Sequence, residues 1–250
     1  MGGRILAAWF WAFTAVTAAA EPGFQPVRGV VFLDPGHGGR DPGAVVAGLQ
    51  EKDITLAMAD RLEAALAAAG FAVARSRDDD SFVPLDRRVT LAQAAGADLL
   101  LSLHADTVTV GAASGASVYR LAESATDALA AELASMANAG APATPGLAAV
   151  PPDLRAMLGS MMIAETDART ELLAHAVIEA LAERVPLLAG RPLRGAAFRV
   201  LMAPDIPSVL VELGFLSHVE DRRRLMDEAW RGEAVAALVT AVERWFSATE

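Results

Sequence analysis

Cysteine is missing from this chain of 250 residues, and its absence excludes both disulfide bonds and a catalytic thiol. Stability must therefore come from a hydrophobic core, or from a metal ion held by histidine and carboxylate side chains. Lysine occurs once, as Lys52, and the formal net charge is −10. A nucleic-acid-binding protein needs a basic surface, and the sequence has no cluster of Lys and Arg, so we expect no nucleic-acid partner.

Long apolar runs are also absent after the first twenty residues, so we expect no membrane span in the chain beyond them. Hydrophobic residues nevertheless make up 54% of the sequence and charged residues 21%, which is typical of a globular protein with a sizeable core. The length suits one α/β domain, or one such domain with an insert.

The first twenty residues have the order of a secretory signal peptide. Arg4 gives a positive start, residues 5–17 form an apolar run of 13 residues, and residues 18–20 are small alanines suited to cleavage. We therefore expect residues 1–20 to be removed, and the mature chain, residues 21–250, to be exported, for example to the periplasm. The alternative is an uncleaved N-terminal anchor, although the run is short for a membrane span.

Short apolar runs alternate with helical patterns along most of the remaining chain. The sequence predicts strands over residues 29–33, 71–76, 99–103, 116–121, 198–202 and 208–211, and helices over residues 52–69, 85–95 and 233–246. Strands separated by helices favour a mostly parallel sheet. We therefore expect a single α/β domain built on a mixed, mostly parallel sheet with helices on both faces.

Residues 122–186 interrupt this alternation, and we expect them to form a helical insert within the domain. Helices are predicted near residues 126–138 and 153–163, followed by a longer one over residues 167–184. Residues 140–152 are rich in Ala, Pro and Gly and indicate a loose linker. One side of the second helix carries an apolar stripe, which consists of Leu154, Met157, Leu158, Met161 and Met162.

Two of the four histidines directly follow predicted strands. His37 lies in a glycine-rich turn, and His104 ends the run LLLSLH. Glu51 opens the first long helix, and Glu212 ends the run SVLVE. Ligands gather at the carboxyl ends of strands in open α/β sheets, so we expect these four side chains to share one sheet edge. A catalytic zinc site needs three protein ligands, one open position and a base, and two His with two Glu meet that need.

Each of these residues taken alone also has an ordinary structural explanation. A histidine after a strand is usually a satisfied structural residue, Glu51 could merely favour the positive end of its helix, and Glu212 could be a buried salt-bridge partner. Spacing alone also leaves the two glutamates exchangeable, with Glu51 as the base and Glu212 as a ligand. We expect His175 to be structural and His218 to lie at the surface.

Four motifs in one order make a family resemblance specific. They are DPGHGG at 34–39, EKD at 51–53, SLHAD at 102–106 and VELGFLS at 211–217. Together they resemble the zinc-dependent N-acetylmuramoyl-L-alanine amidase family of cell-wall amidases, over about residues 27–246. The resemblance implies a zinc cofactor, Zn2+, with His37, Glu51 and His104 as its ligands and Glu212 as the catalytic carboxylate.

The activity implied by the resemblance is hydrolysis of the amide bond between N-acetylmuramic acid and L-alanine in peptidoglycan, in cell-wall remodelling and daughter-cell separation. Glu212 would accept a proton from the attacking water and return it to the departing amine. Two alternatives remain open: a zinc hydrolase acting on another bond, such as a carboxypeptidase or deacetylase, and a binding module descended from an enzyme. The chain departs from the family at Asp106, where Asn is frequent.

Some members of this family that act in cell division carry an insert where this chain has residues 122–186. A helix of that insert covers the zinc site until an activator binds. The resemblance therefore implies that the helix near residues 153–163 restrains activity and that an activator protein displaces it. The alternative is a helix packed permanently on the domain. The family has an acidic residue in the stretch that corresponds to residues 134–139, but this chain has none there. The resemblance therefore assigns no carboxylate of residues 134–139 to blocking the zinc site.

Overall fold

The computed structural model describes residues 27–108, 113–139 and 152–249, with side chains described from Glu165 onward in the helix that begins at Pro152. The predicted signal peptide, residues 1–20, lies outside the described residues. So does nearly all of the predicted linker at residues 140–152. No helix in the described part of the chain is long and apolar enough to span a membrane.

A six-stranded sheet in the order β4-β1-β5-β8-β6-β7 forms the centre of the domain. Its strands are β1 (Val30–Pro35), β4 (Ala72–Arg75), β5 (Leu99–His104), β6 (Ser117–Leu121), β7 (Leu193–Ala196) and β8 (Ser208–Glu212). All neighbouring strands are parallel except β6 and β8, which pair antiparallel. The prediction of a mixed, mostly parallel sheet is therefore confirmed.

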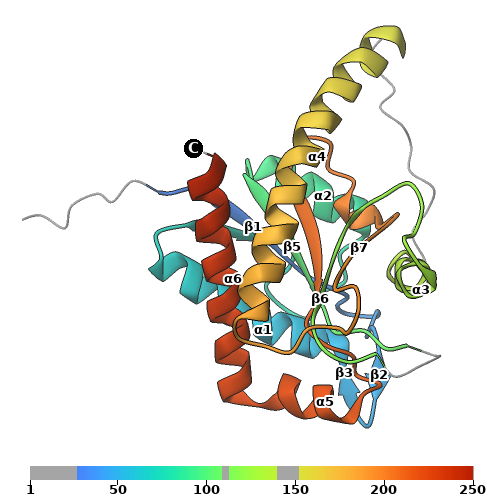
Figure 1. The fold of residues 1–250 in the computed structure, drawn as a ribbon, viewed down its shortest axis with the longest axis vertical. Coiled ribbons are helices and arrows are strands. Elements are labelled where there is room, and N and C mark those ends of the chain that lie inside the picture. Colours follow the sequence, from blue (N-terminus) through green and yellow to red (C-terminus); the bar gives the residue numbers. More distant parts are fainter. Residues whose placement is uncertain (1–26, 109–112, 140–151, 250) are drawn as a thin grey trace, which may run out of the picture.

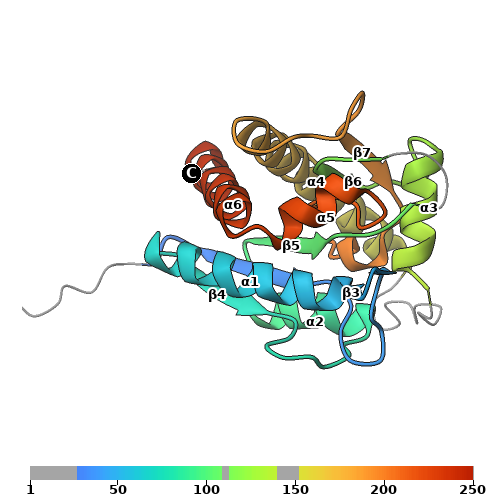
Figure 2. The ribbon, with the colours of Figure 1, turned by 90° about the horizontal axis from the view of Figure 1, so that it is seen from below.

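In the described part of the chain, six α-helices pack around this sheet in two layers (Figure 1). They are α1 (Glu51–Ala68), α2 (Leu85–Ala94), α3 (Ala128–Ala137), α4 (Pro152–Ala182), α5 (Val219–Met226) and α6 (Glu228–Thr249). Side chains alternate across a strand, so Val31 and Leu33 belong to the core cluster that α1, α4 and α6 share, whereas Phe32 belongs to the cluster of α2 and α3 on the other face. Both views show α4 and α6 side by side (Figures 1 and 2).

The prediction of a strand over residues 198–202 is wrong. That segment holds a short 3-10 helix, η1 (Arg199–Leu201), and the strand β7 precedes it. Phe198, Val200 and Leu201 are buried beside α2 and β8, whereas Met202 is 45% exposed. Periodicity alone does not separate a short buried turn from a short strand, since both place apolar residues in the core.

The two helices predicted over residues 153–163 and 167–184 are one continuous helix, α4, so that boundary is also wrong. The polar residues between them include no proline or glycine, so nothing there interrupts the backbone hydrogen bonds of a helix. Thr166 is accommodated because its hydroxyl donates to the carbonyl of Pro204, at 2.9 Å. At the end of the chain, the predicted helix 233–246 extends over the whole of α6, and α5 precedes it.

The first turns of α4 contain the segment at residues 153–163 that was expected to cover the site. Figure 1 shows these turns at the opposite end of the domain from β2 (Val45–Val46) and β3 (Leu49–Gln50), a hairpin that the sequence did not indicate. The apolar stripe lies outside the described side chains. Covering of the site by this segment therefore stays a prediction, and it would require these turns to move.

Candidate metal centre

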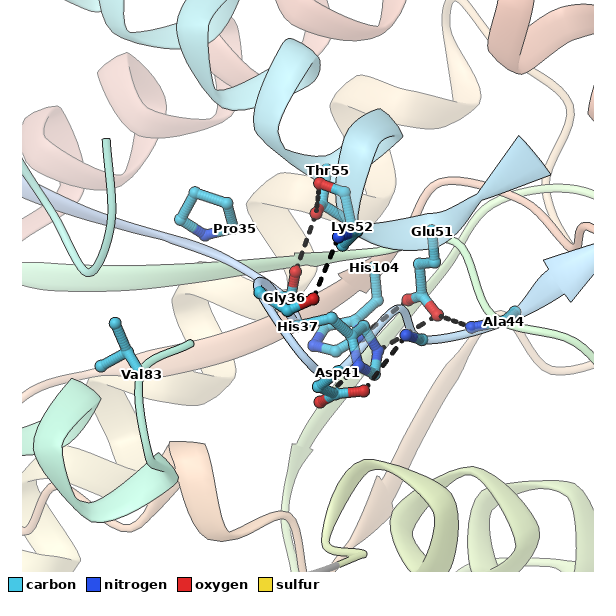
Figure 3. Close-up of polar contacts among 12 residues, drawn as sticks. Pro35, Gly36, His37, Asp41, Ala44, Glu51, Lys52, Thr55, Val83 and His104 are labelled. Atoms are coloured by element: carbon cyan, nitrogen blue, oxygen red, sulfur yellow. Dashed lines mark hydrogen bonds and ion pairs between the residues drawn. The ribbon is translucent and has the colours of Figure 1, made fainter. Parts of the chain in front are cut away.

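The carboxyl ends of β1 and β5 bring two histidines together. The strands are parallel neighbours, with Pro35 opposite Leu103, so the turn after β1 lies beside the end of β5. The rings of His37 and His104 stand edge to face, with centroids 5.0 Å apart. Glu51 approaches them from the start of α1, directly after the β2–β3 hairpin, and one ligand atom from each of the three residues lies within 4.8 Å of the others (Figure 3).

Glu51 is fully buried, and both of its carboxylate oxygens are engaged. Oε1 lies 2.9 Å from Nδ1 of His104 and accepts from the backbone N–H of Ala105, whereas Oε2 accepts from the N–H of Ala44. Burial raises the pKa of Glu51, but the charge of His37 and the hydrogen bond from His104 hold it well below its ordinary value. The carboxylate is therefore ionised when a cation arrives.

His37 presents one ring nitrogen to the centre and turns the other to a carboxylate. Its Nδ1 lies 3.0 Å from Oδ2 of Asp41 (Figure 3). Oδ1 of Asp41 accepts from the N–H of Gly43. Burial lowers the pKa of His37, but the Glu51 carboxylate and the bond to Asp41 raise it to about 10. An outer carboxylate of this kind fixes the tautomer and orientation of a metal-binding imidazole.

Nε2 of His37 supports the interpretation as a metal site. This buried nitrogen lies 3.1 Å from Oε2 of Glu51, but no hydrogen-bond partner for it is found among the described residues. A buried polar atom without a partner is rare and calls for an unseen ligand or ion. Two imidazoles and one carboxylate are a frequent ligand set for catalytic zinc, so the residues fit that ion.

The backbone around His37 is unusual and is held by two buried arginines. His37 has a φ of 62°, a left-handed conformation that is costly for a residue with a side chain. Arg88 donates to the carbonyls of Pro35 and His37, at 2.9 and 2.7 Å, and Arg77 donates to those of Pro35 and Gly36, both at 3.0 Å. A Cβ at Gly36 would lie 2.6 Å from Nε2 of His104, so only glycine allows this close approach.

Arg88 is itself paired with Asp34 beneath the centre. The two side chains are almost completely buried and lie 2.7 Å apart, and Asp34 also accepts from the hydroxyls of Ser76 and Ser102. Burial raises the pKa of Asp34, but Arg88 and the two hydroxyls lower it more, so the net shift is downward. This ionised pair anchors the turn that carries His37.

Glu212 lies next to the three-residue group without being part of it. It ends β8 opposite His104, is buried, and accepts from the backbone N–H of Asp106 at 3.1 Å. Burial and the carboxylates of Asp106 and Glu51 raise its pKa well above the ordinary value. Burial also raises the pKa of Asp106, to about 7, with a further contribution from Glu51. A protonatable carboxylate therefore adjoins the candidate ligands.

The two remaining histidines lie elsewhere. His175 is on α4 with its side chain 56% exposed beside Glu171, so it has a surface position and no structural role in the core. His218 precedes α5 and lies 4.0 Å from Asp221. Asp41 and Arg88 were not among the residues predicted from the sequence. Asp41 could have been noticed as the acid four residues after His37, whereas nothing in the sequence separates Arg88 from its exposed neighbour Arg87.

Comparison with known proteins gives one consistent result. A family model described as N-acetylmuramoyl-L-alanine amidase matches residues 31–244. N-acetylmuramoyl-L-alanine amidase AmiC of Neisseria meningitidis is 36% identical over 234 residues, which cover 89% of this chain and 55% of AmiC. The chain thus spans a little over half the length of that relative. AmiA of Salmonella typhimurium is 35% identical over 220 residues, covering 87% of this chain and 76% of AmiA.

Solved structures agree with the sequence comparisons. The amidase AmiC2 of Nostoc punctiforme superposes with a TM-score of 0.63 at 26% identity, over 88% of this chain and 98% of AmiC2. An N-acetylmuramoyl-L-alanine amidase from Clostridium difficile superposes with a TM-score of 0.64 at 24% identity, a likeness that concerns the fold alone.

Proposed function

Because the chain belongs to the N-acetylmuramoyl-L-alanine amidase family, we propose that it hydrolyses the amide bond between N-acetylmuramic acid and L-alanine in peptidoglycan. The observation that carries the proposal is the convergence of His37, Glu51 and His104 within 4.8 Å at the carboxyl edge of the sheet, with Glu212 beside them. We assign the first three as ligands of a zinc ion and Glu212 as the catalytic carboxylate.

Zinc bound by these three residues would supply Lewis-acid activation of water and of the amide carbonyl. Glu212 would take the proton of the attacking water on its carboxylate and pass it to the nitrogen of the departing L-alanine. The raised pKa of Glu212 suits a group that must hold a proton between two steps. Asp41 would keep the proton of His37 on Nδ1, so that Nε2 faces the metal.

The exchanged assignment, with Glu51 as base and Glu212 as ligand, has less support. Both oxygens of Glu51 already accept backbone N–H groups and adjoin the two histidines, and its pKa is lowered. Glu212 adjoins the group of three ligand atoms without belonging to it, which favours it as the base.

The ligand assignment predicts the metal content of variants. We expect His37→Ala and His104→Ala each to lose the zinc that the parent protein retains, because two ligands do not hold the ion as three do. Elemental analysis after dialysis measures this. His175→Ala is the matched control, since that histidine is exposed on α4, and it should retain one equivalent. Full zinc in both site variants would remove the assignment.

Digestion of purified sacculi tests the reaction itself. The proposal expects stem peptides that begin with a free L-alanine amino group, identified by mass spectrometry, together with glycan strands freed of peptide. Loss of terminal residues from the peptides would indicate a carboxypeptidase, and loss of acetyl groups from the sugars a deacetylase. Intact sacculi with bound protein would indicate a binding module. Each of these three results contradicts the proposal.

We further propose that the protein acts outside the cytoplasmic membrane, where peptidoglycan lies, and that residues 1–20 are a signal peptide. The order of one arginine, an apolar run and small residues supports this. N-terminal sequencing of protein from the cell envelope should find a mature chain that starts near Glu21. An intact Met1 on cytoplasmic protein would contradict export.

The insert is proposed to regulate the enzyme during cell-wall remodelling and daughter-cell separation. Its support is the family resemblance and the position of residues 153–163 at one end of a long helix, which a partner protein could reposition. Deletion of residues 151–163 is expected to raise hydrolysis in the absence of an activator. A folded variant with an unchanged rate on purified peptidoglycan would oppose the regulatory role.

A further inference from the structure

We propose that Arg40 binds a carboxylate of the stem peptide and thereby places the peptide side of the substrate in the hollow beside the metal centre. This inference rests on the proposed function and deepens it, since it assigns the polarity with which the substrate lies across the site. Arg40 would act as a specificity-determining residue and takes no part in the chemical step.

The hollow adjoins the candidate ligands directly. His37 and His104 line one side, and the remaining wall comes from the segment before α2, from the end of α3 and from η1. Its apolar surface consists mainly of Phe82, Val83, Pro84, Leu85, Phe198 and Val200. A mostly apolar hollow with a few polar groups at the reacting end is typical of a ligand site.

Arg40 lies in the wall of this hollow and is exposed. Its guanidinium carbon lies 4.3 Å from the centroid of the Phe82 ring, so the ring face orients the cation while the N–H groups stay available. The stacking depends on the close approach of two loops. Gly39 has a φ of 58°, and a Cβ there would lie 2.7 Å from the backbone nitrogen of Phe82.

The acids near Arg40 are engaged by other cations. Asp41 pairs with His37, Asp80 pairs with Lys52 at 2.6 Å, and Asp86 pairs with Arg199 at 2.8 Å. In the part of the chain that the structure describes, Arg40 makes the contact with Phe82 and no ion pair. An arginine with free N–H groups offers the paired donors that a carboxylate prefers.

The charge distribution of the substrate then sets its direction. In amide-linked peptidoglycan the sugar side of the scissile bond is uncharged, because the lactyl carboxyl is tied up in the amide. Carboxylates occur only on the peptide side, beyond the first alanine. In a chain with a net charge of −10, these anions need a local cation, and Arg40 supplies one beside the ligands. The peptide therefore lies toward Arg40 and the glycan strand lies away from it.

Binding of two matched probes tests this directly. The probes are N-acetylmuramoyl-L-alanyl-D-glutamate with its γ-carboxyl blocked as the methylamide, as in the stem peptide, and the same compound with its α-carboxyl amidated as well, so that only the first carries a carboxylate. Both are measured by calorimetry on zinc-loaded Glu212→Gln protein so that neither is consumed. We expect the acid to bind about tenfold more tightly than the amide, as a charge-assisted hydrogen bond provides. Adding Arg40→Gln should weaken binding of the acid about tenfold and leave binding of the amide unchanged. Arg40→Lys should retain part of the difference in affinity between the two probes.

Arg223→Gln is the matched control, because this arginine is exposed on α5, away from the hollow, and should leave both affinities unchanged. Three results would each overturn the proposal. They are equal weakening of the binding of both probes in Arg40→Gln, tighter binding of the acid than of the amide that persists in Arg40→Gln, and no binding of either probe. The sacculus digestion is independent of these measurements. If the parent protein failed to release stem peptides while the probes behaved as expected, the proposed reaction would fail and the role of Arg40 would stand.

Discussion

Glu212→Gln is expected to lower peptidoglycan hydrolysis by about a hundred- to ten-thousand-fold while zinc stays bound. Glutamine preserves the size of the side chain and still accepts from the N–H of Asp106, so the fold and the ligand geometry should persist. It cannot take a proton from water or return one to the departing amine. The release of L-alanine amino termini from purified sacculi measures the rate, and elemental analysis on the same sample measures the zinc.

A carboxylate far from the centre provides the control. Glu220→Gln makes the same chemical change on the exposed face of α5 and should hydrolyse sacculi at the parental rate. A Glu212→Gln protein that retained both its zinc and more than about a tenth of the parental rate would remove Glu212 from the mechanism. Loss of zinc from this variant would instead point to Glu212 as a ligand.

Arg88→Met should destabilise the domain by about 3–5 kcal/mol, the usual result of removing one partner of a buried ion pair. The change leaves the buried Asp34 without its counter-charge and removes the donors to the carbonyls of Pro35, His37 and Val83. Urea denaturation at neutral pH measures the difference. Arg87→Met is the control, because Arg87 is the exposed neighbour on α2, and it should change the stability little.

The stability lost in Arg88→Met should depend on pH, because the pKa of Asp34 is lowered in the parent protein. In the parent, the pKa of Asp34 is lowered, so its charge stabilises the fold above the ordinary carboxyl pKa and that stabilisation is lost as the pH falls. Without Arg88, burial would raise the pKa of Asp34. Protonation of Asp34 in acid would then remove its unpaired buried charge and restore part of the variant's stability. The gap between variant and parent should therefore be widest at neutral pH and narrow at about pH 4 and below. A gap that is constant with pH would mean that the pair contributes only packing.

The parts of the fold that could be predicted are those with a strong period. The buried strands ending at Pro35 and His104 are apolar runs, and α1 repeats its apolar residues every three to four positions, so both were recognisable. The β2–β3 hairpin was not, because two strands of two residues have no measurable period. The continuity of α4 was missed because polar residues at its surface resemble a break.

The candidate site was predictable to the extent that topology determines it. The ends of neighbouring parallel strands meet, so His37 and His104 could be expected to lie close together, and the motif around Glu51 indicated the third member. The conformation of the turn could not be read in the same way. It depends on Arg88 and on Arg77, which reach backbone carbonyls about 40 to 50 positions away through long side chains, and no local pattern marks such contacts.

Anomalous diffraction at the zinc absorption edge, from crystals of the purified protein, would show directly whether His37, Glu51 and His104 bind zinc. We expect one strong peak between Nε2 of His37, the carboxylate of Glu51 and Nδ1 of His104, adjoining Glu212. A zinc-loaded crystal with no peak at that position, or with its zinc bound by other residues, would contradict this expectation.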